Sequence, residues 1–123
     1  MRAELALCPH LAAVAPGAAP FTLAPAEILE WDGAPVVAVA RCAVCGACAW
    51  LERIEGPSFS LAALRAEDAA LYFRNVSRGS CDVARARAER EALAASAGPR
   101  ERRVVLDAGG QRVVAASPFA PGS

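Results

Sequence analysis

The feature that most constrains this chain is a pair of cysteines separated by two residues, Cys42-Ala43-Val44-Cys45, followed directly by Gly46. A turn of this length aims both sulfurs at one point, and glycine supplies the left-handed backbone that such a turn needs. Cysteine thiolates are preferred ligands of zinc. The spacing therefore predicts that Cys42 and Cys45 bind one metal ion together.

A second ligand pair lies upstream, where Cys8 and the single histidine, His10, are separated by one residue. Two residues from each pair would complete a tetrahedron around zinc and leave no open position for a substrate. Such a closed site stabilises the fold instead of catalysing a reaction. We therefore predict a structural zinc site built from Cys8, His10, Cys42 and Cys45.

The residues on both sides of Cys42 and Cys45 are strand-like, and together they resemble the metal knuckle of zinc-ribbon and rubredoxin-like modules. The resemblance covers about residues 36 to 54. It implies a hairpin whose tip presents Cys-x-x-Cys-Gly, with a second ligand pair supplied from elsewhere in the chain.

Cys48 opens an alternative interpretation. Residues 42–48 also resemble the first three ligands of a bacterial ferredoxin cluster, and Cys8, which precedes a proline, resembles the remote fourth ligand. Glu52 stands where that family usually has a further cysteine. The alternative is a small iron–sulfur or thiol redox protein that uses Cys8, Cys42, Cys45 and Cys48, and a third reading leaves these thiols buried without a ligand.

The composition favours one small domain whose core needs an additional stabilising element, such as a metal ion. The chain has 123 residues, of which 55 % are hydrophobic, but many of these are alanine and bury little area. Only two Trp, four Phe, one Tyr and one Met are present, so the core is thin and a metal would stabilise it. All thirteen basic residues are Arg, which together with abundant Ala, Gly and Pro is typical of a bacterial GC-rich genome.

Charge and hydropathy exclude several classes of function. Thirteen acidic residues balance the thirteen arginines, so we expect no general nucleic-acid binding. Glu4, Pro9 and His10 interrupt the apolar start of the chain, and no run is long enough to cross a membrane. We therefore expect a cytoplasmic protein with no membrane association, in which cysteines serve metal or redox chemistry more often than disulfides.

The first half of the sequence predicts a three-stranded antiparallel meander. Residues 28–31 and 36–40 are apolar runs joined through Asp32-Gly33, a typical hairpin turn. Residues 49–54 form the third run, which Gly56-Pro57 ends. Residues 11–20 are rich in Ala, Pro and Gly and are predicted to form a loop.

The second half predicts two helices and a hairpin. Leu61, Leu64, Leu71 and Tyr72 recur at helical spacing and predict a helix over 58–75. A second helix is predicted over 82–97, and residues 103–107 and 111–115 are predicted to pair as strands. The tail, residues 117–123, is predicted to be disordered.

The sequence thus predicts an α+β fold: a small antiparallel β-meander with a metal knuckle, followed by two helices and a C-terminal β-hairpin. The single domain would span 1–116, with a metal-binding β part (1–56), a helical part (57–99) and a hairpin (100–116). We favour a non-enzymatic, zinc-stabilised module that binds another protein over an enzyme. Its binding surface would be the helical half, or an inter-helix turn that bears Arg74, Arg78, Arg85 and Arg87.

Overall fold

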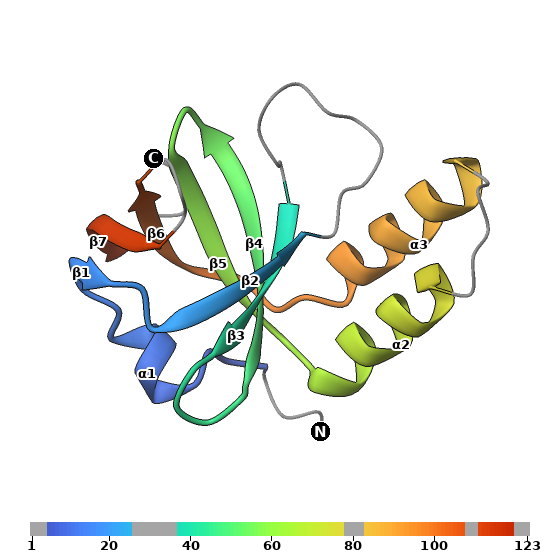
Figure 1. The fold of residues 1–123 in the computed structure, drawn as a ribbon, viewed down its shortest axis with the longest axis horizontal. Helices are drawn as coiled ribbons and strands as arrows, with labels where there is room; N and C mark the ends of the chain where they lie inside the picture. The colour runs from blue at the N-terminus through green and yellow to red at the C-terminus, as the bar shows by residue number, and fades with distance from the viewer. Residues whose placement is uncertain (1–4, 26–36, 78–82, 108–110, 120–123) are drawn as a thin grey trace.

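The computed structural model describes residues 5–25, 37–77, 83–107 and 111–119, which form a curled antiparallel sheet and three helices (Figure 1). The strands are β1 (Gly17–Ala18), β2 (Phe21–Pro25), β3 (Val37–Cys42), β4 (Cys48–Glu55), β5 (Ser58–Leu64), β6 (Arg100–Leu106) and β7 (Arg112–Pro118). The helices are α1 (Pro9–Ala12), α2 (Ala66–Ser77) and α3 (Val83–Ala95). The seven strands lie in the order β1-β7-β6-β5-β4-β3-β2. The described part is mostly β with some helix, which is consistent with the predicted α+β class.

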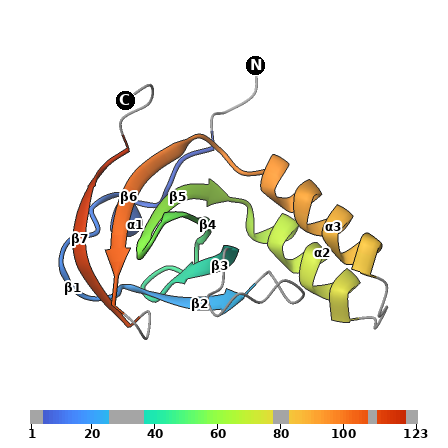
Figure 2. The ribbon, with the colours of Figure 1, turned by 90° about the horizontal axis from the view of Figure 1, so that it is seen from above.

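The sheet curls until its two ends are joined by one stretch of chain. β1 pairs with β7 and β2 pairs with β3, although only Ala19 and Pro20 separate β1 from β2. Backbone bonds continue both pairings: the Ala19 amide donates to Gln111 O at 3.0 Å, and the Ala43 amide donates to Pro20 O at 2.8 Å. The result is a barrel-like ring with the helical pair outside it (Figure 2).

Two cores lie on the two faces of this sheet. In β3, Ala38 and Ala40 face an inner core inside the curl, whereas Val37 and Val39 face an outer core. The alternation follows from the period of two in a strand. The inner core consists of Leu7, Leu11, Val14, Phe21, Ala38, Ala40, Cys42, Ala49, Leu51, Leu61, Ala63, Val104, Leu106 and Val113. The outer core consists of Val37, Val39, Trp50, Ala62, Leu64, Ala69, Tyr72 and Leu93, and α2 and α3 cover it.

The predicted meander is confirmed where it can be tested. β3 and β4 are antiparallel neighbours, and Gly56, with a φ of 52°, lies in the turn after β4. The predicted strand over 28–31 and its turn at 32–33 lie outside the described residues. The strand that pairs with the other edge of β3 is β2, which the predicted meander does not include. It ends at Pro25, and a proline within a short apolar run weakens the strand signal.

The predicted helix over 58–75 is wrong in its first half. Residues 58–64 form β5, between β4 and β6, and α2 begins only at Ala66. Leu61 faces the inner core and Leu64 faces the outer core, so β5 is buried on both faces. Such a strand shows no alternation of polar and apolar residues, and two leucines three positions apart then imitate a helical spacing.

The remaining elements agree with the prediction except at their ends. α3 occupies the predicted second helix, and β6 and β7 form the predicted hairpin. The loop predicted over 11–20 is wrong in part, because α1 and β1 include some of these residues. The disordered tail is also wrong at its start, since β7 continues to Pro118 and the Phe119 amide donates to Glu101 O at 3.1 Å. No helix of the described residues is long and apolar enough to cross a membrane.

Candidate metal centre

The first ligand pair lies at the beginning of α1. Cys8 is the N-cap of this helix, with the extended backbone typical of that position, and its Sγ accepts a hydrogen bond from the Leu11 amide at 3.4 Å. Pro9 occupies the first helical turn, where a backbone N–H would have no acceptor within the helix, so the lack of an N–H in proline costs no helical hydrogen bond. This short turn places His10 beside Cys8 on the same end of the helix.

The second ligand pair lies in the turn between β3 and β4. Cys42 ends β3, and its Sγ accepts from the Val44 amide at 3.4 Å. The Cys42 amide donates to Ala47 O at 2.8 Å, and the Gly46 amide donates to Cys42 O at 3.0 Å, which closes the turn. Gly46 has a φ of 78°, as the sequence predicted for this knuckle.

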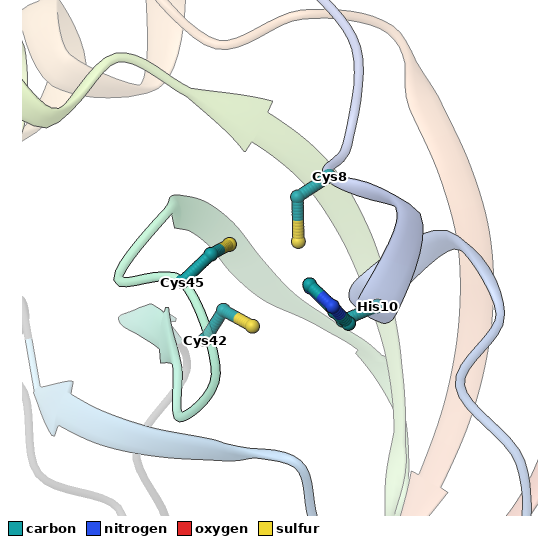
Figure 3. Close-up of side chains that lie close together, drawn as sticks. All are labelled: Cys8, His10, Cys42 and Cys45. Atoms are coloured by element: carbon teal, nitrogen blue, oxygen red, sulfur yellow. The ribbon is translucent and has the colours of Figure 1, made fainter.

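The fold brings the two pairs together. The ligand atoms of Cys8, His10, Cys42 and Cys45 all lie within 4.8 Å of one another. Figure 3 shows the four side chains around a common centre, two from the N-terminal segment and two from the β3–β4 turn. Zn–S bonds of about 2.3 Å put tetrahedral sulfurs about 3.8 Å apart, so small side-chain rotations would bring these atoms to bonding distance. The cluster could therefore hold one metal ion.

The environment favours the thiolate at one of the cysteines. Burial by itself raises the pKa of Cys42, but hydrogen bonds from the backbone of Cys45 and Val44, and from the Cys45 and Cys8 thiols, lower it to about 7. Burial raises the pKa of Cys8, and the bond from the Leu11 amide opposes this effect in part. Because metals bind thiolates, Cys42 is the ligand best prepared for an incoming ion.

Residues 5–14, the N-terminal segment that includes α1, also contact the sheet through buried side chains and two hydrogen bonds outside the cluster. Leu11 is fully buried in the inner core. The Leu7 amide donates to Glu101 Oε2 at 2.7 Å, and Arg102 Nη2 donates to Val14 O at 3.0 Å. Leu11 falls within the loop predicted over 11–20. The signal that could have indicated α1 is Pro9, because proline is favoured at the first position of a helix.

Cys48 does not join the other cysteines. It lies at the start of β4 and packs against the outer core, whereas Cys42 belongs to the inner core. The two thiols therefore point to opposite faces of the sheet, and Cys48 Sγ donates to Gly46 O at 4.0 Å. The structure thus assembles the four predicted zinc ligands and leaves out the cysteine that distinguishes the iron–sulfur alternative.

The described arginines of the predicted binding surface lie away from the cluster. Arg74 and Arg87 are exposed on α2 and α3, while Arg78 and the side chain of Arg85 lie outside the described part of the structure.

Comparison with known proteins adds no family to this geometry. The resemblance to zinc-ribbon modules remains confined to the knuckle, since here the second ligand pair comes from the start of α1. No protein-family model, curated protein or solved structure matches the chain.

Proposed function

We propose that Cys8, His10, Cys42 and Cys45 bind one Zn²⁺ ion whose role is structural, and that the chain is a non-enzymatic module that binds another protein. The observation that carries the proposal is the convergence of four zinc-type ligand atoms within 4.8 Å from two separate segments. Four protein ligands fill the tetrahedral shell, so the ion would have no position for a reacting water or substrate.

The chemistry of the donor set favours zinc. Three sulfurs and one imidazole form a Cys₃His set, which is typical of structural zinc sites. Calcium and magnesium prefer oxygen ligands, and the cluster offers none. The ion would tie the N-terminal segment to the end of β3, a link between residues far apart in the sequence.

Metal analysis of matched cysteine variants tests this site. We expect the purified chain to hold one zinc per molecule by native mass spectrometry, Cys45→Ser to lose it, and Cys48→Ser to keep it. Both variants replace one thiol with a hydroxyl, at positions only three residues apart. The main difference is that Cys45 belongs to the cluster and Cys48 does not. Zinc retained by Cys45→Ser would overturn the proposal, and an iron–sulfur mass that disappears in Cys48→Ser would support the redox alternative instead.

For the protein partner we assign the surface of α2 and α3. The two helices extend beyond the sheet on one side (Figures 1 and 2). Leu71 is 47 % exposed on α2, one turn before the exposed Arg74, and an apolar side chain beside a cation is typical of interface surfaces.

Photo-crosslinking in the source cell should give a discrete adduct from a photoreactive residue at Leu71. The matched position Ile54, 39 % exposed on β4, should give none, and equal adducts from both would contradict the assignment.

A further inference from the structure

A hollow of about 320 Å³ lies on the outer face of the sheet, between the first half of α2 and the ends of β2, β3 and β4. Its helical wall is made of Ala66, Ala69, Ala70 and Phe73, which are three and four positions apart and therefore share one face of α2. Three of these four residues are alanines. Because alanine has no side chain beyond Cβ, this face does not fill the space above the strands. The hollow is thus a consequence of the sequence of α2.

The remaining walls are mostly apolar. Val39 and Phe73 line the hollow from the outer core. On β2, the exposed Thr22 and the half-buried Leu23 also line it, although the Leu23 side chain packs against the inner core. A cavity of 150 Å³ holds benzene, so a space of this size suits a ligand of about ten to twelve non-hydrogen atoms. The volume also lies in the range of small-molecule sites.

One cation at the hollow, Arg41, has no partner for its side chain among the described residues. Arg41 lines it, is exposed, and makes no ion pair or hydrogen bond through its side chain with any of the described residues. The acidic residues of the first turn of α2, Glu67 and Asp68, do not line the hollow. A guanidinium beside an apolar cavity is complementary to a carboxylate that carries an apolar chain, because it can donate two parallel hydrogen bonds.

We propose that this hollow binds a small carboxylic acid, with the carboxylate on Arg41 and an unbranched apolar chain of about eight carbons against Val39 and Phe73. The hollow is separate from the candidate metal centre. Its only lining cysteine among the described residues, Cys48, packs against the outer core and is not one of the four candidate ligands. Binding at the hollow is therefore independent of the zinc proposal, and each can fail alone.

Calorimetry on the full chain as purified tests the proposal, with octanoate as the probe. We expect octanoate to bind, and octanol, which has the same chain but no charge, to bind at least about tenfold more weakly. Arg41→Gln should weaken octanoate about tenfold and leave octanol unchanged. The matched control Arg112→Gln removes an equally exposed arginine from β7 and should leave both affinities unchanged.

Two further measurements locate the ligand. Ala70→Phe adds bulk at an exposed helical position that lines the hollow, so it should abolish octanoate binding while circular dichroism shows the fold retained. Octanoate should also slow alkylation of Cys48, measured by site-resolved mass spectrometry. Equal affinity for octanol, full affinity in Arg41→Gln, full affinity in Ala70→Phe, or no protection of Cys48 would each overturn the proposal.

Discussion

The four candidate ligands differ in how far solvent reaches them. Cys42 is buried with 2 % of its surface exposed, Cys8 is half-buried, and His10 and Cys45 are exposed. The cluster therefore has a protein-facing side and a solvent-facing side. A bound ion would be shielded by the inner core through Cys42 and reached by small chelators past Cys45 and His10.

Tyr72 gives a prediction at the scale of one side chain. Burial in the outer core, and to a lesser extent the charge of Glu89, raise the pKa of this tyrosine above its usual value of 10. The neutral phenol is favoured in the folded chain, so its contribution to stability is complete below pH 10 and falls as the pH rises from there through the raised pKa. Tyr72→Phe should therefore flatten the alkaline fall in the free energy of unfolding.

The composition makes the phenolate easy to assign. Tyr72 is the single tyrosine and the chain has no lysine, while the cysteine thiols, which titrate in a neighbouring range, are the same in both proteins. The phenolate can be followed by ultraviolet absorption and the stability by urea unfolding at each pH. If the free energy of unfolding falls equally with rising pH in the unmodified chain and in Tyr72→Phe, the ionisation of Tyr72 is not the cause of that fall.

At the scale of elements, the segment that includes α1 is the one that would depend most on a bound metal. α1 is a single helical turn, and its segment contacts the sheet through Leu7, Leu11 and Val14 in the inner core, two hydrogen bonds and the candidate ligands. An isolated helix of this length is not stable in water. α2 and α3, in contrast, pack against the outer core and against each other, where Asn75 Nδ2 donates to Glu89 Oε2 at 3.0 Å.

Chelation of the metal should therefore act unequally on the elements. We expect hydrogen exchange to accelerate first over residues 5–14 and the β3–β4 turn, and to change little over α2. Global stability should fall by about 4 kcal/mol if free zinc stands about a thousandfold above its Kd. The exchange is read by mass spectrometry with and without a chelator, and Cys45→Ser without chelator serves as the control. If hydrogen exchange accelerates equally along the whole chain, the ion does not stabilise residues 5–14 and the β3–β4 turn in particular.

Elements also show how far the sequence could predict this structure. The knuckle, α3 and the β6–β7 hairpin follow from local signals, namely a Cys-x-x-Cys-Gly turn, an Ala-rich stretch before Gly98, and two short β-branched runs. β5 and β2 could not be found in this way. β5 is buried on both faces and lacks alternation, and β2 is defined by its pairing with a strand twelve or more positions later. The four candidate ligands follow from side-chain chemistry together with the short spacing within each pair, whereas the approach of the two pairs to within 4.8 Å depends on the fold.

At the scale of the whole molecule, the curled sheet separates two regions of different chemistry. The metal centre lies at the end of β3 beside the inner core, and the hollow lined by Arg41 and Cys48 lies on the outer face beneath α2. β3 contributes to both, because Arg41 and Cys42 are neighbours whose side chains point to opposite faces. One strand thus places a candidate ion-binding residue and a candidate ligand-binding residue on the two sides of a sheet.

The closure of the sheet also fixes an order of events during synthesis on the ribosome. The metal centre needs the chain only as far as Cys45, whereas the ring closes when Gly17 pairs with Val113, almost at the end of the chain. Such a distant pairing is slow to form, because a long loop must close first. All four candidate ligands have therefore been synthesised long before β7, so an ion can order the first strands while the last ones are still being made.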